Sequence, residues 1–395
     1  MDNKKVVHIA LVGGQTMPVY LTLESTPAKI FYLIHSSSTK FSAEKMKNDL
    51  VFLMGDCSVE LREFDPIDFQ KAIEGFKELL SKYNDYKIEV NISSGTKPWS
   101  IAMAILSERF PNMELLYVSQ NSRIYNYRTA EVEEVEQLAI EDIFLYNQTV
   151  YSENRLLKDY TEDDLNIIPQ IKAVRKKYNI GKPSLFNLLT IPDKSNQNRY
   201  TNNVKDTIID DYTSSKITWD KQYHAEPGDH AQQYVKLSLN NDFGDTEEFE
   251  FISPHAFDLV TSSGWFEYEV ATVLKKWAGC KQVWLNVKFP YKDQQPQNEI
   301  DIIVGTGEKL LFVECKTQIK SVTDIDKFHS AVRNYGGMGA KAIFITESKM
   351  TNYAIEKCNK NGIKHFSFTG QNNNKVKHEM LFKILDEIME LSNTR

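Results

Sequence analysis

The sequence lacks the features that would tie it to a membrane, a disulfide framework or a zinc site. No stretch approaches about 18 uninterrupted apolar residues, and the N-terminus has neither a signal-peptide hydrophobic segment of usual length nor a cleavage site. The four cysteines, Cys57, Cys280, Cys315 and Cys358, lie far apart with no CxxC pair. We therefore expect reduced thiols and a cytoplasmic protein.

An excess of positive charge is also missing. Lys and Arg number 47 against 54 Asp and Glu, which gives a formal net charge of -7 and a pI near 5.7. This balance argues against a protein that coats nucleic acid through bulk charge and leaves only a local basic groove. Hydrophobic content of 41% and charged content of 26% are typical of a folded globular protein, and 395 residues exceed one ordinary core. We expect at least two domains.

The first part of the chain alternates strand and helix patterns. The apolar runs are VVHIALVGG, KIFYLIHSSS, VELREFDP, KIEVNISSG and MELLYVSQ, and the stretches between them include the amphipathic DFQKAIEGFKELLSKY. Apolar strands interleaved with helices predict a parallel sheet covered on both faces. The fold class is therefore α/β, with a Rossmann-like domain over residues 1–140.

The pattern loosens over residues 141–249. Thr161 and Asp164 predict a capping box at the start of a helix, and KPSLFNLLT resembles a short second helix. The basic run of the first helix, residues 172–177, is typical of a solvated helix face, with a nucleic-acid rim as the alternative. Residues 193–230 are polar and irregular. We interpret the region as a linker, an insertion or a loop that orders on a partner.

A second periodic region covers residues 250–395. An amphipathic helix over residues 253–279 is followed by strands at QVWLNVKFPY, EIDIIVGTG and KLLFVECKT, then by a helix over 324–334, the strand KAIFIT and further helices. Trp265 in the first helix is expected in the core, with the border of a nucleotide pocket as the alternative. This order of elements indicates an α/β nuclease-like domain.

Carboxylates interrupt two of these strands. Glu299 and Asp301 share one face of their strand, Glu314 and Lys316 share one face of the next, and the turn GTGE joins the two as a hairpin. Two carboxylates and an amine would then converge, and hard divalent cations favour such oxygen ligands. This arrangement points to metal-assisted phosphodiester hydrolysis. The alternative is edge-strand charge that prevents aggregation.

The pattern resembles the PD-(D/E)XK nuclease superfamily. Asp301 matches its strand aspartate, and Glu314 and Lys316 match its E-x-K; Glu267 fits the helix acid better than Glu269. Isoleucine precedes Asp301 where the motif nominally has proline, and Glu299 is left without a firm role. The resemblance implies a catalytic set of Glu267, Asp301, Glu314 and Lys316, of which the three acids bind Mn²⁺ or Mg²⁺.

Polar loops follow three strands of the N-terminal domain. They are GGQTMP after the first strand, HSSSTK after the second and NISSGTKP before a helix. Exposed amides at a helix N-terminus beside Lys97 favour an anionic ligand at the carboxyl edge of the sheet. Neither GxGxxG nor GxxxxGK[ST] occurs, which disfavours an ordinary dinucleotide or triphosphate site. Turn glycines and a helix cap without a ligand are the alternative.

Together, G-G-Q-x-x-P, S-G-T-K-P, G-W-F-E, E-I-D and E-C-K resemble the CARF-nuclease effectors of type III CRISPR systems, over about residues 1–140 and 250–395. The resemblance implies a homodimer whose CARF domains bind a cyclic oligoadenylate, with cyclic tetra-adenylate favoured, and a ligand-activated nuclease acting on DNA, RNA or both. The ligand-binding residues it implies are Gly13, Gly14, Gln15, Thr16, Pro18, Ser36, Ser37, Ser38, Asn91, Ser94, Gly95, Thr96 and Lys97.

Two other functions stay open at this point. One is an ungated restriction-type or repair nuclease whose N-terminal domain only dimerises or grips DNA. The other is a ligand-sensing transcription regulator with an inactive nuclease domain. The intact set of Asp301, Glu314 and Lys316 argues against the regulator, and the acidic balance weakens DNA gripping through bulk charge.

Overall fold

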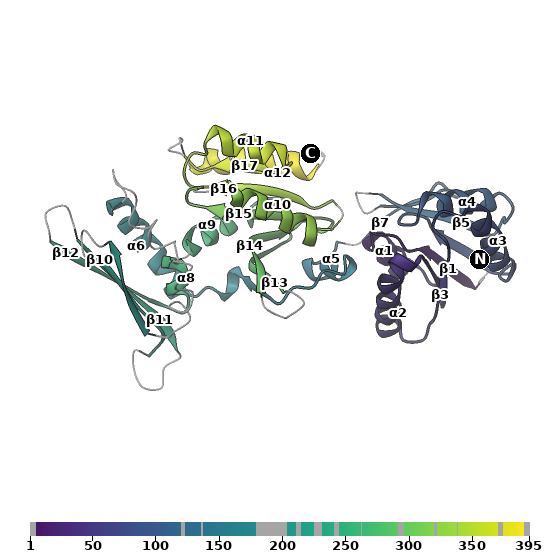
Figure 1. The fold of residues 1–395 in the computed structure, drawn as a ribbon, viewed down its shortest axis with the longest axis horizontal. Coiled ribbons are helices and arrows are strands. Elements are labelled where there is room, and N and C mark those ends of the chain that lie inside the picture. The colour runs from purple at the N-terminus through teal and green to yellow at the C-terminus, as the bar shows by residue number, and fades with distance from the viewer. Residues whose placement is uncertain are drawn as a thin grey trace. The chain divides into compact units, whose positions relative to one another are not determined.

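The computed structural model describes residues 5–119, 123–135, 137–178, 204–210, 215–224, 231–240, 245–261, 263–290, 296–319, 322–337, 339–369 and 374–390. The chain forms two compact units (Figure 1). The first consists of residues 1–150, 305–311 and 330–341, and the second of residues 151–304, 312–329 and 342–395. Within the described ranges, no helix has the length and apolar character needed to cross a membrane.

The first unit contains a seven-stranded sheet in the order β3-β2-β1-β4-β5-β6-β7. Strands β1 to β5 are parallel, which confirms the predicted Rossmann-like domain, and β6 and β7 extend one edge in antiparallel pairing. The strands are β1 Val6–Leu11, β2 Ile30–His35, β3 Ser58–Glu63, β4 Lys87–Asn91, β5 Met113–Val118, β6 Arg123–Asn126 and β7 Val132–Glu134.

Apolar runs place the central strands of this sheet. Five of the six residues of β1 are buried, as expected for a strand covered on both faces. The helices are α1 Met17–Ser25, α2 Lys40–Met54, α3 Phe69–Ser81 and α4 Lys97–Ser107. Trp99 and Met103 of α4 and Phe76 of α3 pack with Leu11 and Val90 in one core. This packing holds the ends of β1 and β4 in fixed positions.

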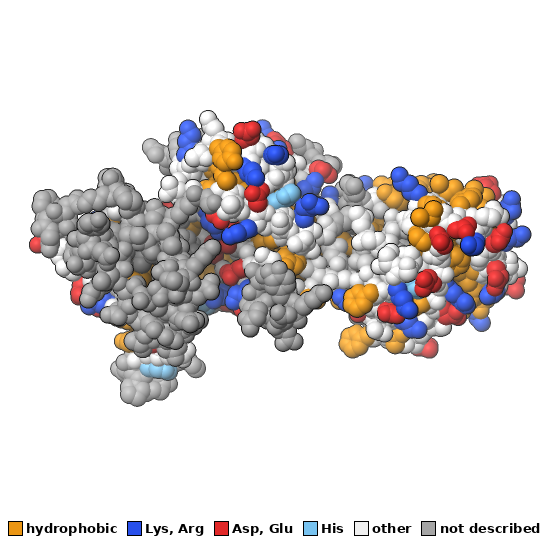
Figure 2. Space-filling view, viewed as in Figure 1, with side chains coloured by type: hydrophobic (Ala, Val, Ile, Leu, Met, Phe, Trp, Pro, Cys, Tyr) orange, Lys and Arg blue, Asp and Glu red, His pale blue; other side chains and the backbone are white. Residues whose placement is uncertain are grey.

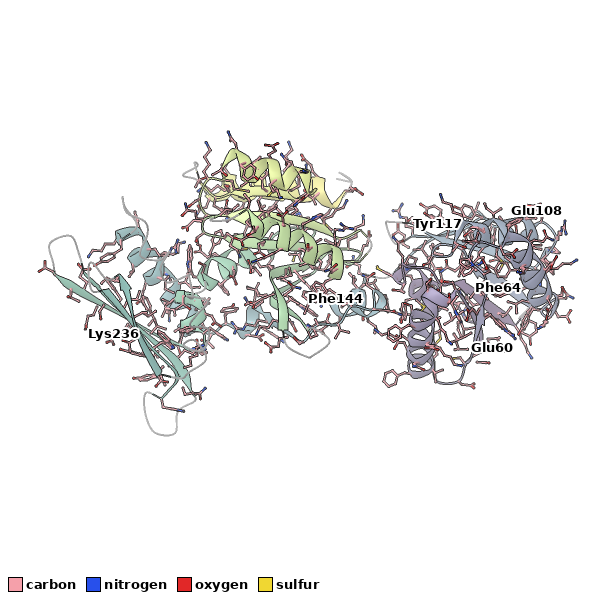
Figure 3. All side chains as sticks on the ribbon, viewed as in Figure 1. Glu60, Phe64, Glu108, Tyr117, Phe144 and Lys236 are labelled. Carbon is pink, nitrogen blue, oxygen red and sulfur yellow. The ribbon has the colours of Figure 1, made fainter. Side chains whose placement is uncertain are left out.

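A short helix, α5 (Ile140–Tyr146), completes the first unit. Phe144, labelled in Figure 3, is 1% exposed. Tyr146 stacks on Tyr20 of α1 with ring centroids 5.1 Å apart, and its carbonyl accepts a hydrogen bond from Thr16 Oγ1 at 2.5 Å. These contacts fix α5 to the loop that follows β1.

The same helix is flanked by contacts to the two distant segments of its unit. Leu138 N donates to Gly307 O at 2.8 Å, and Thr149 Oγ1 donates to Tyr335 O at 3.3 Å. Residues 305–311 include the turn between β14 (Pro296–Gly305) and β15 (Leu310–Lys316) of the second sheet, so the segment around α5 bonds to backbone continuous with that sheet.

The second unit is built on a six-stranded sheet in the order β17-β16-β15-β14-β13-β8. The strands are β8 Glu153–Leu156, β13 Gln282–Pro290, β14 Pro296–Gly305, β15 Leu310–Lys316, β16 Lys341–Thr346 and β17 Lys364–Ser367. The helices are α6 Glu162–Tyr178, α8 Ala256–Thr261, α9 Gly264–Leu274, α10 Thr323–Tyr335, α11 Asn352–Lys360 and α12 Asn374–Met389. One short 3₁₀ turn, η2 Leu157–Asp159, lies in this unit, and another, η1 Ser37–Thr39, lies in the first unit. This α/β arrangement confirms the predicted nuclease-like fold.

Two expectations for the central region need correction. The single helix expected over residues 253–279 is divided into α8 and α9, and Ser263 between them adopts φ 63°. Part of the polar stretch 193–230, expected to be irregular, forms the strands β9 Val204–Asp210 and β10 Ser215–Tyr223. These pair with β11 Gln232–Asn240 and β12 Thr246–Ser253 in a four-stranded antiparallel sheet. The short helix expected at KPSLFNLLT lies outside the described residues. The domain limits at residues 140 and 249 stay predictions.

The predicted capping box at the start of α6 is confirmed. Thr161 N donates to Asp164 Oδ2 at 2.8 Å, and Asp164 N donates to Thr161 Oγ1 at 3.4 Å. Asp164 also accepts from His255 N at 3.0 Å, which ties the helix to the segment before α8.

Candidate functional site

The acidic residues predicted on two strands meet in the second unit. In β15 the apolar run Leu310 to Val313 is buried, and Glu314, Cys315 and Lys316 follow it. Cys315 points to the core at 2% exposure, so Glu314 and Lys316 share the opposite face. Asp301 lies among buried isoleucines of β14 and is itself 9% exposed.

Lys316 joins the two carboxylates. Its Nζ lies 2.7 Å from Glu314 Oε1 and 3.4 Å from Asp301 Oδ2. Asp301 Oδ2 also accepts the backbone N–H of Cys315 at 2.7 Å, which fixes the carboxylate against β15. The predicted convergence of Asp301, Glu314 and Lys316 is therefore present in the structure.

The helix acid is contributed by the first turn of α9. Glu267 is 7% exposed, and its Oε2 accepts a hydrogen bond from Asn286 Nδ2 at 2.9 Å. The same Nδ2 lies 3.2 Å from Glu299 Oε1. Glu269 instead pairs with Lys172 at 2.6 Å, away from this group. Of the two helix acids that the sequence left open, Glu267 is the one beside the strand carboxylates.

Asn286 was missed by sequence reasoning. It lies in β13 at φ 49°, where the register with β8 shifts between Leu285 and Lys288. Irregularities of this kind redirect a side chain, and here the amide points toward Glu267 and Glu299. A single asparagine in NVK carries no motif, so only the pairing of strands could have identified it.

Burial and mutual repulsion change the acid-base behaviour of the group. Burial, reinforced by Asp301, raises the pKa of Glu314 to about 8 and holds the pKa of Glu267 well above its usual range. Burial disfavours the Lys316 ammonium, but Asp301 and Glu314 outweigh that effect and raise its pKa above the ordinary value. Lys316 is therefore a charged hydrogen-bond donor at neutral pH.

A polar cleft of about 520 Å³ opens beside Glu267. Asn286, Lys288 and Glu299 line one side of it, and Arg155 and Asp258 line another. The cations are already paired, Arg155 with Asp258 at 2.8 Å and Lys288 with Glu153 at 2.6 Å. Neither cation was predicted, and both are placed to meet a phosphate.

The donor set suits a hard divalent cation. In the described part of the chain, no three acidic, histidine or cysteine side chains form a ready coordination cluster. Mg²⁺ typically uses only one or two carboxylates and keeps several waters, and because burial raises the pKa of Glu314, its ionised form gains from a neighbouring positive charge. Asp301 and Glu314, which converge on Lys316, match that requirement.

The polar loops of the first unit are connected to one another. Ser94 Oγ accepts from Gly13 N at 3.2 Å and donates to Gln15 O, and Thr39 Oγ1 donates to Val12 O at 3.0 Å. The loops after β1, β2 and β4 thus meet where β1 stands between β2 and β4. Such a switch point in strand order is where open α/β sheets bind ligands.

Two glycines are sterically required at this point. A Cβ at Gly13 would lie 1.6 Å from Ser94 O, and one at Gly95 would lie 2.5 Å from Leu11 Cβ. A Cβ at Gly14 would meet no atom within 4 Å. Gly13 and Gly95 therefore serve close backbone packing, whereas Gly14 faces open space.

The predicted ligand residues differ in their exposure to solvent. Gly14, Gln15, Ser37, Ser38 and Lys97 are exposed. Thr16, Pro18, Ser36 and Asn91 are buried, and Asn91 Nδ2 is used inside the fold by Pro18 O at 2.9 Å and Thr22 Oγ1 at 2.6 Å. Ser94, Gly95 and Gly13 are half-buried between the two groups. Contacts from the buried group to a ligand stay predictions.

Thr96 has one of the few buried side-chain polar atoms without a hydrogen-bond partner among the described residues. It caps α4 without a side-chain hydrogen bond, and its Oγ1 is buried with no partner among the described residues. An unsatisfied buried hydroxyl is costly, so Thr96 Oγ1, beside Lys97 at a helix N-terminus, is a candidate donor to a ligand or a water molecule.

Family models match both units. Residues 6–123 match the model described as HFX_2341_N-like, N-terminal, and residues 262–369 match the model described as restriction endonuclease. No curated protein matches the sequence.

Solved structures share the complete architecture. Can2 from Sulfobacillus thermosulfidooxidans, in complex with cyclic tetra-adenylate, is 16% identical with a TM-score of 0.65 over 97% of this chain and 99% of that one. Protein VC1899 from Vibrio cholerae is 14% identical with a TM-score of 0.65, covering 98% of both chains. A type III CRISPR defence DNA nuclease activated by cyclic oligoadenylate is 14% identical with a TM-score of 0.50, covering 94% of this chain and 50% of that one. At these identities the likeness establishes the fold.

Proposed function

We propose that this chain, which has the two-domain fold of the CARF-nuclease effectors and a restriction-endonuclease domain, is a nuclease activated by cyclic oligoadenylate in type III CRISPR defence. It hydrolyses DNA or RNA phosphodiester bonds with Mn²⁺ or Mg²⁺. The convergence of Glu267, Asp301, Glu314 and Lys316 beside a polar cleft carries the enzymatic part of this proposal.

The chain's own residues have distinct roles in the reaction. Asp301 and Glu314 would hold the metal ion, which would supply activated water and charge stabilisation at phosphorus. Glu267 completes the acidic set, oriented by Asn286 at 2.9 Å. Lys316 stays protonated because its pKa is raised, so it donates hydrogen bonds to water or to the developing charge and does not act as the base.

The first unit senses the activator. Gly14, Gln15 and Lys97 offer exposed contacts, and Thr96 Oγ1 offers an unsatisfied hydroxyl, to a ring of phosphates and adenines. Can2, which shares this fold, is solved with cyclic tetra-adenylate, and that ring is our first choice of ligand.

A two-fold ligand favours a homodimer. Ile101 and Ile105 of α4 are 53% and 43% exposed, and Tyr117 and Tyr127 beside them are 38% and 61% exposed. In Figure 2, hydrophobic side chains gather on this unit over α4 and β5, and Figure 3 labels Tyr117 at its surface. We propose that a second copy covers this apolar patch.

Gating would pass through α5. Thr16, next to the ligand loop, bonds to Tyr146, and the segment around α5 bonds to Gly307 and Tyr335. Gly307 lies in the connection between the strands of Asp301 and Glu314. A ligand that binds the active arrangement more tightly than the resting one would shift the equilibrium by that difference.

The test separates binding from chemistry. Lys97→Ala should weaken binding of cyclic tetra-adenylate, because a charge-assisted phosphate contact contributes on the order of 1.5–3 kcal/mol. Activity should then fall at low activator and recover at high activator. Lys316→Ala should bind the ring normally and stay inactive at every concentration. Calorimetry measures the binding of the ring, and cleavage of plasmid and single-stranded nucleic acid in manganese measures the activity.

Unchanged ring affinity in Lys97→Ala would contradict the ligand placement. Wild-type cleavage that is equal with and without the ring would favour the ungated nuclease. Ring binding without any cleavage of DNA or RNA would favour the sensing regulator.

A further inference from the structure

Helix α9 separates two cavities. Gly264 and Glu267 line the polar cleft, whereas Trp265, Phe266 and Glu269 line a second cavity of about 510 Å³. Residues three and four apart share a helix face, so the second cavity occupies the side of α9 away from the carboxylates. None of the roles proposed above uses it.

A residue that lines the second cavity is hydrogen-bonded to the strand of Glu314 and Lys316. Glu347, on its wall, donates its backbone N–H to Lys316 O at 3.1 Å. Neighbouring parts of the chain line both cavities. Tyr160, just before α6, lines the polar cleft, and Lys172 of α6 lines the second cavity. The second cavity is therefore connected to the strand of Glu314 and Lys316 through Glu347.

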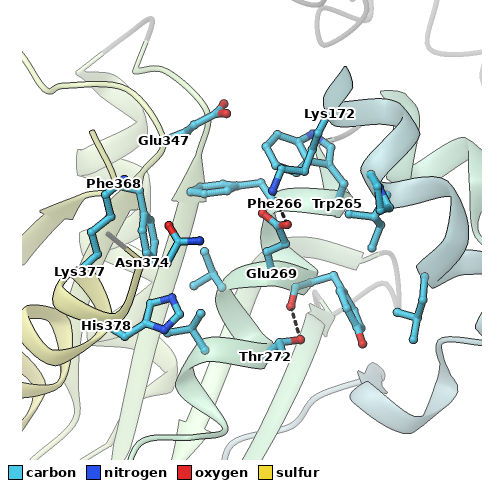
Figure 4. A pocket seen from close by; sticks show the side chains of 16 residues that line it. Lys172, Trp265, Phe266, Glu269, Thr272, Glu347, Phe368, Asn374, Lys377 and His378 are labelled. Atoms are coloured by element: carbon cyan, nitrogen blue, oxygen red, sulfur yellow. Dashed lines mark hydrogen bonds and ion pairs between the residues drawn. The ribbon is translucent and has the colours of Figure 1, made fainter. Parts of the chain in front are cut away.

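The walls of the second cavity are aromatic. Phe266 and Phe368 meet edge to face with centroids 6.2 Å apart, and Phe368 meets His378 at 6.4 Å. Burial, with Lys276 and Lys377 nearby, lowers the pKa of His378, so its ring is neutral at neutral pH. Figure 4 shows these rings facing a shared space, with Asn374 and Lys377 at its edge.

Two of the cations around the cavity form ion pairs, and a third forms none with a described residue. Lys172 pairs with Glu269 at 2.6 Å, and Arg175 pairs with Glu347 at 2.9 Å while covering the Trp265 ring. Lys377 has no ion-pair partner within the described ranges. An apolar cavity with one unpaired cation at its rim suits a flat ring that carries a single phosphate.

We propose that this cavity holds an unpaired nucleobase of the substrate strand a few nucleotides from the phosphate being cut. The inference rests on the proposed nuclease function and deepens it. Phe266 and Phe368 offer the apolar faces, Asn374 offers a two-sided amide for the base edge, and Lys377 meets the adjoining phosphate. A base can enter only if it is unstacked, so the substrate is single-stranded or locally opened.

The experiment uses full-length protein with cyclic tetra-adenylate and manganese. Single-stranded oligonucleotides carry one abasic site, moved one position at a time around the cut. Wild type should show a KM raised about 5- to 150-fold at one position, the range expected for losing one base–aromatic stack. The kcat should change little.

Variants locate the effect in the cavity. Phe368→Ala should raise KM for the intact strand and no longer distinguish it from the abasic strand. Lys377→Ala should raise KM for both strands. Lys383→Ala is the matched control, because Lys383 lies on the same helix, is exposed and does not line the cavity.

Equal KM for intact and abasic strands at every position, with normal cleavage by wild type, would overturn the cavity assignment and leave the proposed function intact. Retained base discrimination by Phe368→Ala would do the same. If wild type cleaves no strand with activator and manganese, the proposed function fails and this inference fails with it.

Discussion

At the scale of single residues, Lys316 holds an acidic site together before any cation binds. It lies within 3.4 Å of two carboxylates that would otherwise repel each other in a buried setting. Removing one partner of such a group leaves uncompensated charge, so substitutions here affect chemistry and stability together.

Asp301→Asn should nearly abolish cleavage while the protein still binds its activator. A metal-assisted step loses several kcal/mol of barrier stabilisation without its ligand, on the order of a thousandfold in rate. Glu308→Gln is the matched control, since Glu308 is exposed on the turn between the same strands. Near-normal turnover by Asp301→Asn in manganese would contradict the assignment.

The raised pKa of Glu314 predicts a pH dependence of stability in metal-free protein. The folded state keeps the Glu314 proton up to about pH 8, whereas the unfolded chain loses it near the ordinary glutamate pKa of 4.5. The folded state thus binds more protons across this interval, so the free energy of unfolding falls as pH rises through it.

Thermal melts in EDTA between pH 5 and 9 measure this dependence, and Glu314→Gln should flatten it because its amide does not titrate. Saturating manganese should also flatten it, since the ion favours the ionised carboxyl. An identical pH profile for wild type and Glu314→Gln would show that Glu314 titrates normally.

Sequence reasoning recovered residues whose spacing along one strand or hairpin is fixed. Asp301, Glu314 and Lys316 follow from the two-residue alternation of strands joined by a short turn. Asn286, Lys288 and Arg155 could not be predicted, because β13 and β8 bring them to the cleft across long separations in sequence. A lone polar residue on a strand carries no such spacing.

At the scale of elements, the loop after β1 depends on the absence of side chains. Gly13→Ala should destabilise the first unit by about 1–3 kcal/mol, because the new Cβ would lie 1.6 Å from Ser94 O and the loops must move apart. Activator binding should weaken with it. Denaturant melts and calorimetry measure the two effects.

Gly14→Ala is the matched control for fold, because a Cβ there meets no atom within 4 Å. Its melt should match wild type, whatever happens to ligand affinity. Equal stability of Gly13→Ala and wild type would contradict the close contact between the loops.

Elements with strong periodicity were predicted well, and the misses have physical causes. The helix expected over 253–279 has continuous apolar spacing, yet Ser263 at φ 63° ends one helix and begins another. In β10, polar and apolar residues alternate over Lys216 to Asp220 as in a sheet with one solvated face, and the polar residues led us to expect irregular structure.

At the scale of the molecule, dimerisation should depend on α4. Ile101→Asp should weaken self-association by a hundredfold or more, because burying an unpaired carboxylate costs several kcal/mol. Sedimentation at several concentrations measures this, and cyclic tetra-adenylate affinity should fall in parallel.

Ile67→Asp provides the comparison, since Ile67 is 81% exposed in the loop between β3 and α3 and is not a residue of the proposed patch. Its association should equal that of wild type. A wild-type protein that sediments as a monomer with and without the ring would contradict the two-fold arrangement.

The hydrogen bonds between the segment around α5 and distant parts of the chain also determine when that segment can finish folding during synthesis. Strands β1 to β5 end at Val118, so that sheet has all its residues early in synthesis. Tyr335, which accepts from Thr149, is made 186 residues later, roughly ten to forty seconds at ribosomal speeds. The segment around α5 therefore waits for its second set of partners until Asp301, Glu314 and Lys316 have been made. A nascent chain makes its parallel sheet first and the strands of Asp301, Glu314 and Lys316 next, and the segment around α5 completes its hydrogen bonds only when α10 emerges.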